Sequence, residues 1–240
     1  MVPPAPPGEI EISLVVPTFN ESENVREFLT ALRGVLESAA SGRYEVIVVD
    51  DDSPDRTWEL AADLDFPEVR VVRRRGERGL ASAVIRGWQA ARGRVIGTIN
   101  ADFQHPPEIM DAMVRAAADA DLVVASRHAA GGGFGDWHWS RQFASHFAHR
   151  AGLIVLPQVF RRLSDPLSGC YLVRRAAIEG EELHPLGYKT LIEITVRGRI
   201  ERIRECPYVM RDRLRGQSKM GPRQTLQFFL HLLRLRKASR

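Results

Sequence analysis

Three oxygen-bearing side chains stand at alternate positions in one short stretch of the chain. Asn100, Asp102 and Gln104 follow an apolar run at residues 95–99, and prolines at 106–107 then open a helix. Because side chains alternate along an extended segment, all three can project to one side of the strand's end. A carboxylate and an amide carbonyl at this spacing suit a hard divalent cation that substrate phosphates also hold. The alternative is a strand-to-helix turn whose polar residues cap the helix.

Two other polar clusters also follow apolar runs. Pro-Thr-Phe-Asn-Glu occupies residues 17–21, and Asp-Asp-Asp-Ser-Pro-Asp occupies residues 50–55. In open parallel sheets, ligands bind at the carboxyl ends of the strands, so we expect the three clusters to meet at one edge. No glycine-rich dinucleotide fingerprint follows the first strand, and no Gly-x-x-x-x-Gly-Lys phosphate loop is present.

The elements that must position these clusters alternate regularly up to residue 126. The apolar runs that we interpret as strands are residues 12–18, 45–49, 69–72, 95–99 and 122–125, with a helical pattern after each of the first four. Their continuous hydrophobicity predicts a mainly parallel sheet covered by helices on both faces, an α/β fold. Further along, residues 165–174 read as a turn running into a strand, residues 187–194 as a helix and residues 200–208 as another strand.

Composition indicates an ordinary globular protein with a marked charge division. The hydrophobic fraction is 44% and the charged fraction 27% of 240 residues. Residues 1–120 hold 13 arginines against 20 acidic residues, a net charge of −7, whereas residues 121–240 carry +11. We therefore expect the second half of the chain to bind an anionic ligand or surface. Cys170 and Cys206 lack metal-ligand spacing and read as reduced thiols. No apolar run approaches the roughly 20 residues that span a bilayer.

We divide the chain into a proline-rich disordered tail at residues 1–10, a main domain at 11–220 and a basic amphipathic helix at 221–240. Within the main domain, residues 137–162 carry an apolar stripe flanked by basic side chains. This segment fits a helix in a membrane interface or a helix packed on the sheet. The last helix, with Leu226, Phe229, Leu230 and Leu233 on one face, fits a membrane surface or a partner. The glycine-rich loop at 131–135 is either a gate or a linker.

Seven motifs together resemble the family 2 glycosyltransferases of the GT-A fold. The resemblance is strongest to the dolichyl-phosphate mannose synthases and their bacterial polyprenyl-phosphate glycosyltransferase relatives. It covers nearly all of residues 12–220. The motifs are Pro-Thr-Phe-Asn-Glu (17–21), Val-Val-Asp-Asp-Asp-Ser-Pro-Asp-Arg-Thr-Trp (48–58), Arg-Gly-Leu-Ala-Ser-Ala-Val (78–84), Asn-Ala-Asp-Phe-Gln-His-Pro-Pro-Glu (100–108), Asp-Pro-Leu-Ser-Gly (165–169), Gly-Tyr-Lys (187–189) and Arg-Leu-Arg-Gly-Gln-Ser-Lys (213–219).

The resemblance implies a Rossmann-like GT-A sheet with amphipathic interface helices, and a role for each matched residue. The nucleotide-sugar donor, with GDP-mannose favoured, would be held by Pro17, Phe19, Glu21, Asp51, Asn100 and Asp102. Mg²⁺ or Mn²⁺ would be held by Asp102 and Gln104. The phosphates of donor and acceptor would be bound by Arg127, Arg141, Ser145, Arg213 and Lys219. Catalysis would rest on Asp102, Arg127 and Arg213, with inversion at the sugar carbon.

The implied acceptor is a polyprenyl or dolichyl phosphate at the cytoplasmic membrane face, with no nucleic acid involved. A lipid phosphate is already ionised at neutral pH, so no strong general base is required. A metal can instead neutralise the leaving nucleoside diphosphate while arginines position the acceptor. Many relatives carry carboxy-terminal membrane spans. Here we expect anchoring through the amphipathic segments, which makes the protein peripheral, or through a separate membrane subunit.

Two departures from the family pattern leave alternatives open. Asn100 stands where the family usually has Asp, and Arg56 stands where it commonly has Gly. Loss of one charge at Asn100 predicts weaker metal affinity. One alternative is therefore a non-catalytic nucleotide-binding subunit that recruits a membrane partner. Another is a transferase acting on a soluble hydroxyl acceptor, for which Asp165 is the candidate general base.

Overall fold

A computed structural model of the chain describes residues 1–4, 10–135, 139–215 and 221–238, with the side chains of 139–146, 222–223 and 238 excepted. The strands are β1 (Ile12–Thr18), β2 (Tyr44–Asp50), β3 (Val69–Arg73), β4 (Val95–Thr98), β5 (Leu122–Ser126), β6 (Tyr171–Arg174) and β7 (Ile203–Pro207). The helices are α1 (Val25–Ala40), α2 (Thr57–Ala62), α3 (Leu80–Ala90), α4 (Ile109–Ala116), α5 (Trp139–Val155), α6 (Pro157–Phe160), α7 (Thr190–Arg197) and α8 (Pro222–Ala238), with a 3₁₀ turn at Arg175–Ala177.

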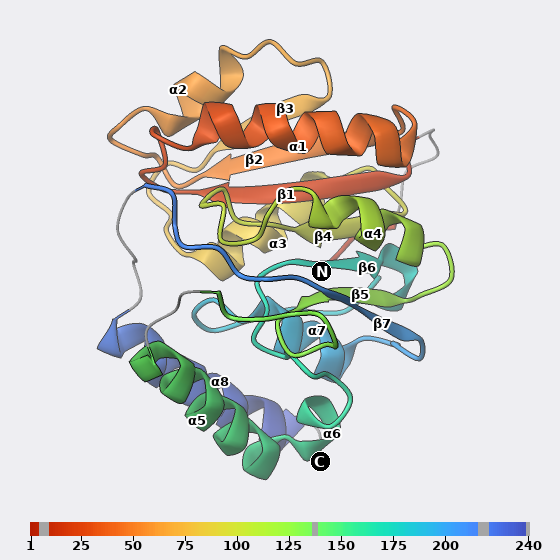
Figure 1. The fold of residues 1–240 in the computed structure, drawn as a ribbon, viewed down its shortest axis with the longest axis vertical. Coiled ribbons are helices and arrows are strands. Elements are labelled where there is room, and N and C mark those ends of the chain that lie inside the picture. Colours follow the sequence, from red (N-terminus) through yellow and green to blue (C-terminus); the bar gives the residue numbers. More distant parts are fainter. Residues whose placement is uncertain (5–9, 136–138, 216–220, 239–240) are drawn as a thin grey trace.

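The seven strands form one sheet in the order β3-β2-β1-β4-β6-β5-β7, sandwiched between helices (Figure 1). The neighbouring pairs of β3, β2, β1 and β4 are all parallel, as is β5 with β7. The mainly parallel α/β sheet is therefore confirmed. β6 was expected as a strand, but its antiparallel insertion between β4 and β5 was not.

Both faces of the sheet are buried, which explains why the strands are apolar without alternation. In β1, Val15 belongs to a core shared with α3, α6, α7 and α8, whereas Leu14 and Val16 belong to a core shared with α1 and α4. Gly87 of α3 lies directly on β1, because a Cβ there would stand 2.5 Å from a methyl of Val15. This close approach brings α3 against the sheet.

The start of the chain departs from the expected disordered tail. Val2 is buried and pairs with Glu179 in an isolated bridge, and the Pro3 carbonyl accepts a hydrogen bond from the guanidinium of Arg175 at 3.1 Å. These contacts hold the described residues 1–4 against the body of the protein. Residues 1–4 dock because the Val2 side chain is buried and the Pro3 carbonyl has a hydrogen-bond partner.

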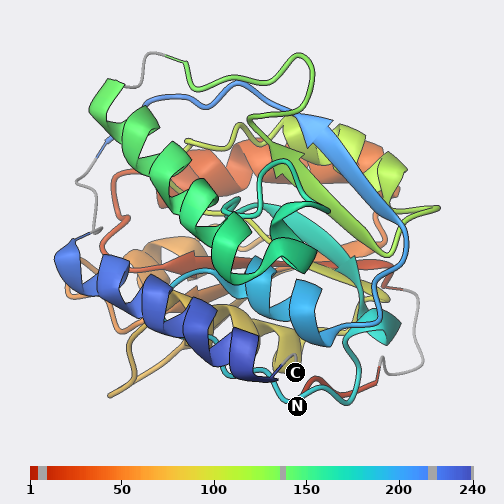
Figure 2. The ribbon, with the colours of Figure 1, turned by 90° about the horizontal axis from the view of Figure 1, so that it is seen from below.

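Helices α5 and α8 lie side by side beyond the β7 end of the sheet, as two views agree (Figures 1 and 2). α5 contacts α6 and α8, so its principal packing partners are helices. In α8, Phe228, Leu232 and Leu235 are buried, and His231 Nε2 faces the buried Glu193 carboxylate of α7 at 3.3 Å.

The opposite side of α8 is also apolar but unburied. Leu226, Leu230 and Leu233 are half or more exposed, as are Phe147 and Ile154 of α5. The leucines of the predicted face therefore lie outward together, with Phe229 partly buried at its margin. A second apolar stripe, which the sequence analysis did not describe, packs on the protein. Among the described residues, no helix combines the length and apolar character needed to cross a bilayer.

Candidate active site

The three polar clusters meet at the carboxyl ends of adjacent strands β2, β1 and β4, as expected. Non-glycine residues in the left-handed region occur in all three loops: Asn20 at φ 52°, Asp52 at φ 55° and Arg56 at φ 60°, and Phe103 at φ 59°. Such conformations cost about 1–3 kcal/mol each and cluster at functional sites. The ring of Phe103 packs edge-on against Phe28 of α1, which holds the Asp102 turn in place.

Asp102 and Glu21, from two different strand ends, are joined by one arginine. Arg213 donates from Nη2 to Asp102 Oδ2 at 2.8 Å and from Nη1 to Glu21 Oε1 at 3.2 Å. The other oxygens are also engaged: the Gln104 N–H donates to Asp102 Oδ1 at 3.1 Å, and Asn24 Nδ2 donates to Glu21 Oε2 at 2.9 Å. Two carboxylates thus converge on a single cation.

Burial and the Arg213 guanidinium shift the pKa of the Asp102 carboxyl group in opposite directions. The residue is only 4% exposed, and this burial raises the pKa of its carboxyl group, an effect that Arg213 counteracts and Glu21 reinforces. Arg213 reaches the site because the segment after β7 runs back along the sheet edge toward the start of α1 (Figure 1). The Arg211 N–H donates to the Gln104 carbonyl at 3.2 Å and ties this segment to the Asp102 turn.

This arrangement fits a divalent cation held jointly with a ligand. No cluster of three His, Cys, Asp or Glu side chains among the described residues could hold a metal alone. The Asp102 carboxylate already attracts a positive group, the Arg213 guanidinium, and Gln104 lies in the same turn. Mg²⁺ is commonly coordinated by a carboxylate and an amide oxygen, with phosphate oxygens in its remaining coordination positions.

Asp51 lies at the same edge but is neutralised by a residue that the sequence reasoning missed. Arg74 donates to Asp51 Oδ1 through both Nε, at 2.8 Å, and Nη2, and the Gly79 N–H donates to Asp51 Oδ2 at 2.7 Å. Arg74 is one of four arginines at residues 70–75, and nothing in that run distinguished it. Nearby, the Arg78 guanidinium lies 4.6 Å from the centre of the Phe19 ring, and Pro17 pairs with Val49 inside the sheet.

The neighbouring acidic residues serve the structure of the loop. Asp50 accepts hydrogen bonds from Thr18 Oγ1, the Ser53 N–H and Ser53 Oγ, each at 2.7 Å. Asp55 accepts from the Ser22 N–H at 3.1 Å and from Thr57. Of the acidic cluster at residues 50–55, these two therefore connect the first two strand ends.

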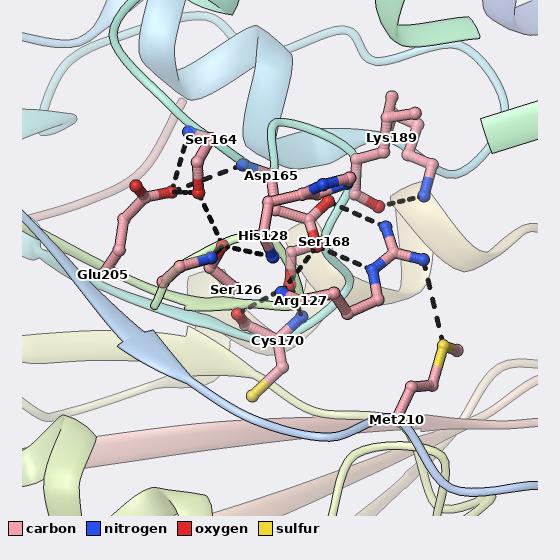
Figure 3. A network of polar contacts seen from close by, with 12 residues as sticks. Ser126, Arg127, His128, Ser164, Asp165, Ser168, Cys170, Lys189, Glu205 and Met210 are labelled. Atoms are coloured by element: carbon pink, nitrogen blue, oxygen red, sulfur yellow. Dashed lines mark hydrogen bonds and ion pairs between the residues drawn. The ribbon is translucent and has the colours of Figure 1, made fainter. Parts of the chain in front are cut away.

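A second polar cluster lies beyond β4, around the Asp165 loop (Figure 3). Arg127 forms a two-pronged pair with Asp165, with Nε–Oδ2 and Nη2–Oδ1 distances of 2.7 Å each, and its Nη1 faces Met210 Sδ at 3.8 Å. Asp165 is 1% exposed and Arg127 is 8% exposed. Burial would raise the pKa of Asp165, but the hydrogen bonds and charge of Arg127 hold that pKa below its usual value. A carboxylate of this kind is a poor proton acceptor, which counts against Asp165 as a general base.

The Asp165 loop is anchored on one side and abuts the Asp102 turn on the other. Glu205 of β7 accepts from the Ser164 N–H at 2.9 Å and the Asp165 N–H at 3.3 Å (Figure 3). A Cβ placed on Gly169 would stand 3.2 Å from Asn100 Nδ2 and 3.7 Å from His105 Cε1. The loop that holds Arg127 is therefore in close contact with the turn that carries Asn100 and Asp102.

His105 is the second residue that the sequence reasoning missed. Its ring stacks on Tyr208 with centres 4.9 Å apart, and neither ring nitrogen has a hydrogen-bond partner among the described residues. Burial, with Arg127 and Lys189 nearby, lowers the pKa of His105 to about 3, so the ring is neutral at pH 7. The only indication in the sequence was that His105 follows Gln104 within the motif at residues 100–108.

Three expected site residues cannot be located in this way. Lys219 lies outside the described residues, and Arg141 and Ser145 lie on α5 where only the backbone is described. The remaining expected residues are all present at the two clusters: Pro17, Phe19, Glu21, Asp51, Asn100, Asp102, Gln104 and Arg213 at the strand ends, and Arg127 beside Asp165.

Comparison with curated proteins places this architecture among known relatives. A dolichol-phosphate mannosyltransferase from Pyrococcus furiosus is 39% identical over 95% of this chain, and the chain spans 64% of that protein's length. An undecaprenyl-phosphate mannosyltransferase from Micrococcus luteus is 33% identical over 88% of each chain. A dolichol-phosphate mannosyltransferase from Saccharomyces cerevisiae is 29% identical, covering 94% of this chain and 87% of the relative.

Solved structures share the fold at lower identity. Glucosyl-3-phosphoglycerate synthase from Mycobacterium tuberculosis, crystallised with Mn²⁺, UDP and phosphoglyceric acid, superposes with a TM-score of 0.73 at 21% identity over 95% of this chain and 78% of that one. A mannosyltransferase from Pyrobaculum calidifontis, crystallised with GDP-mannose and Mn²⁺, gives a TM-score of 0.60 at 18% identity over 99% and 76%. Residues 13–180 match the family described as Glycosyl transferase family 2, and the chain belongs to that family.

Proposed function

We propose that the protein is a metal-dependent, inverting transferase that moves mannose, or glucose, from a nucleotide-sugar to a polyprenyl or dolichyl phosphate. The observation that carries this proposal is the convergence of Asp102, Glu21 and Arg213 beside a loop in which Arg127 engages the Asp165 carboxylate in an ion pair. The names of the P. furiosus and M. luteus relatives support a lipid-phosphate acceptor and a mannosyl donor. We favour GDP-mannose, with Mg²⁺ or Mn²⁺ as cofactor.

On the donor side, Arg213 exchanges partners when the substrate binds. Its guanidinium lies between the two carboxylates. We infer that the donor's diphosphate binds at this place. The diphosphate draws Arg213 toward itself, since arginine pairs with phosphate as readily as with carboxylate. Asp102 and Gln104 would hold the metal, which would supply Lewis-acid stabilisation of the leaving diphosphate.

On the acceptor side, the chain needs to orient an anion rather than remove a proton. An oxygen of the acceptor phosphate attacks the anomeric carbon while the bond from that carbon to the donor's diphosphate breaks. Because the nucleophile is already ionised, the unavailability of Asp165 as a base does not impede the reaction. The same feature disfavours a hydroxyl acceptor, which would need such a base.

We further propose that the exposed stripes of α5 and α8 contact the cytoplasmic membrane surface. Leu226 is 60% exposed, Phe147 61% and Ile154 76%, and the two helices lie side by side. Arg234, Arg236 and Lys237 are exposed at the end of α8 and would attract anionic lipid head groups. This contact would make the protein peripheral, with or without a separate membrane subunit, and would bring the lipid phosphate to the Arg127 side.

The test is a donor screen with detergent-solubilised polyprenyl phosphate, Mn²⁺ and radiolabelled GDP-mannose or UDP-glucose. We expect labelled lipid with GDP-mannose and its loss on metal chelation. The absence of transfer from any donor would overturn the proposal. Activity that appears only in an Asn100→Asp variant would instead favour a non-catalytic, nucleotide-binding role for the natural chain.

A further inference from the structure

The β2 side of the proposed donor site carries an exposed arginine, Arg78. Its guanidinium lies 4.6 Å from the centre of the half-buried Phe19 ring. Phe19 directly follows β1, so the ring supports the guanidinium beside the carboxyl end of that strand. Among the described residues, no carboxylate pairs with Arg78, and its N–H donors are therefore available to a ligand.

The loop that carries Arg78 is fixed to the site through Asp51. The N–H of Gly79, the next residue, donates to Asp51 Oδ2 at 2.7 Å, and the Gly79 carbonyl accepts from Arg74 Nη2 at 3.1 Å. Arg74 itself forms the buried ion pair with Asp51. The backbone beside Arg78 is thus held by two hydrogen bonds, which position its side chain at the strand ends.

The sheet sets the distance between Arg78 and the inferred diphosphate position. Arg213 and Asp102 mark that position at the end of β4. Asp51 follows β2, which lies two strands away, about 10 Å at the usual spacing of neighbouring strands. A nucleoside diphosphate is long enough to span this interval. A donor whose diphosphate lies at Arg213 therefore brings its base to Asp51 and Arg78.

The side chains at this place are suited to a base that offers acceptors. Both carboxylate oxygens of Asp51 already accept hydrogen bonds, from Arg74 and from the Gly79 N–H. The guanidinium of Arg78 provides a planar fork of N–H donors, which matches the adjacent O6 and N7 acceptors of guanine. Uracil has no such pair, because no acceptor nitrogen lies beside its O4.

We propose that Arg78 selects a guanine nucleotide as donor by donating hydrogen bonds to O6 and N7 of the base, with Phe19 as the platform for its guanidinium. The proposal rests on the sugar-nucleotide transferase activity proposed above and deepens its donor specificity. In the competing accounts, Arg78 only packs on Phe19 or only attracts the diphosphate by its charge. Neither of those roles would distinguish one base from another.

Two substitutions at Arg78 separate the fork from the charge. Arg78→Met removes both but keeps an unbranched side chain that can pack on Phe19, whereas Arg78→Lys keeps the charge without the planar fork. Arg75→Met is the matched control, because Arg75 is an exposed arginine of the same loop. Thermal unfolding of each variant checks that the fold persists.

The readout is calorimetric binding of GDP, UDP and 7-deaza-GDP in the presence of Mn²⁺ and without acceptor. In 7-deaza-GDP a carbon replaces N7, so one of the two proposed hydrogen bonds is lost. We expect the unsubstituted protein to bind GDP more tightly than either of the others. Arg78→Met should weaken GDP binding about tenfold or more, the effect of one lost bidentate base contact. It should leave UDP binding unchanged.

The modified base tests the contact itself. GDP and 7-deaza-GDP should bind equally to Arg78→Met, because the partner of N7 is gone. Arg78→Lys should bind GDP more weakly than the unsubstituted protein, and Arg75→Met should match the unsubstituted protein with every nucleotide. The proposal is overturned by a preference for GDP over 7-deaza-GDP that persists in Arg78→Met, by equal weakening of GDP and UDP, or by full GDP binding in Arg78→Lys.

Because these measurements need no acceptor, the two proposals fail separately. An unsubstituted protein that does not prefer GDP to UDP would overturn the role of Arg78 and leave lipid-phosphate transfer standing. A preference for GDP that Arg78→Met abolishes would support the role of Arg78, even if no sugar reached polyprenyl phosphate. That second result would refute only the proposed function.

Discussion

At the residue scale, Arg213 is the side chain on which the proposed donor site depends. It lies between two buried carboxylates, so its removal leaves Asp102 and Glu21 facing each other without a cation. We predict that Arg213→Gln lowers kcat/KM for the nucleotide-sugar by about a hundredfold, the order of effect for a lost charged contact to a leaving group. Mn²⁺ binding in the absence of nucleotide, measured by calorimetry, should become tighter, because the guanidinium no longer competes for Asp102.

The matched control for this prediction is Arg215→Gln. Arg215 is exposed and donates to the Glu23 carbonyl at 2.8 Å, two residues from Arg213 but away from Asp102. It should leave both measurements unchanged. Weaker Mn²⁺ binding in Arg213→Gln would show that the arginine does not occupy a cation's place.

The buried His105 predicts acid sensitivity of the fold. Its pKa is about 3 in the folded protein against 6.5 in the unfolded chain, so the unfolded state takes up a proton first as pH falls. The free energy of unfolding is therefore unaffected by His105 well above pH 6.5 and falls as the pH drops below that value. The fall attributable to His105 is about 2 kcal/mol between pH 7 and pH 5. Urea unfolding of His105→Phe should show a pH dependence smaller by that amount, whereas exposed His184→Gln should match the unsubstituted protein.

Arg56 explains one departure from the family's sequence pattern. It adopts φ 60° and ψ 30° before α2, a left-handed conformation that costs an ordinary residue about 1–2 kcal/mol. Glycine avoids that cost but is more flexible in the unfolded chain, by about 0.5–1 kcal/mol. Arg56→Gly should therefore raise the free energy of unfolding by about 0.5–1 kcal/mol in a denaturant titration. Arg26→Gly, in helix α1, should lower it by a similar amount; stabilisation by both, or by neither, would contradict this account.

What the sequence revealed at this scale was residue type and place along the chain. It indicated that Glu21, Asp51 and Asp102 would gather at strand ends, because strand ends follow from local hydrophobicity. It could not indicate that Arg74 neutralises Asp51 or that Arg213 bridges Glu21 and Asp102. Those pairings depend on the path of the loops in space. The burial of His105 is likewise a property of the folded neighbourhood, not of the motif.

At the element scale, α8 has one side that packs on the protein and another that is exposed, so the two sides can be tested separately. Phe228, His231 and Leu232 are buried, so substitution there would unfold the helix rather than test its surface. Leu230 and Leu233 are about half exposed and can be changed without that cost. We predict that Leu230→Asp combined with Leu233→Asp abolishes sedimentation with anionic lipid vesicles while the thermal unfolding temperature stays nearly constant.

Ala31→Asp, an exposed change on α1 at the other end of the sheet, is the control and should leave vesicle binding intact. Vesicle binding by the doubly substituted protein at the unsubstituted level would rule out the α8 stripe as the contact. The helical period of α8 was evident from the sequence, but not which stripe packs, because that depends on the contacts of α8 with α5 and with Glu193 of α7.

The strand order illustrates the same limit. Parallel pairing of the first strands follows from the alternation with helices, which demands crossover connections. The insertion of antiparallel β6 between β4 and β5 reverses the chain within the sheet, and hydrophobic runs carry no information on strand direction. Its consequence is functional, because the Asp165 loop that leads into β6 is thereby placed beside the end of β4.

At the scale of the whole molecule, the charge division along the sequence becomes a division in space. The acidic half of the chain builds β3, β2, β1 and β4 with their loops, and the basic half builds β5, β6, β7, α5 and α8 (Figure 1). The segment after β7 crosses back and inserts Arg213 among the carboxylates of the acidic half. The proposed donor and acceptor sites thus meet where the two halves join.

The central claim is that the site transfers sugar to an acceptor that is already ionised. It is tested most directly by offering polyprenyl phosphate and the unphosphorylated polyprenol side by side, with radiolabelled GDP-mannose and Mn²⁺. We expect labelled lipid from the phosphate alone, and loss of the label in Asp102→Ala. Equal labelling of the polyprenol, or undiminished transfer by Asp102→Ala, would contradict it.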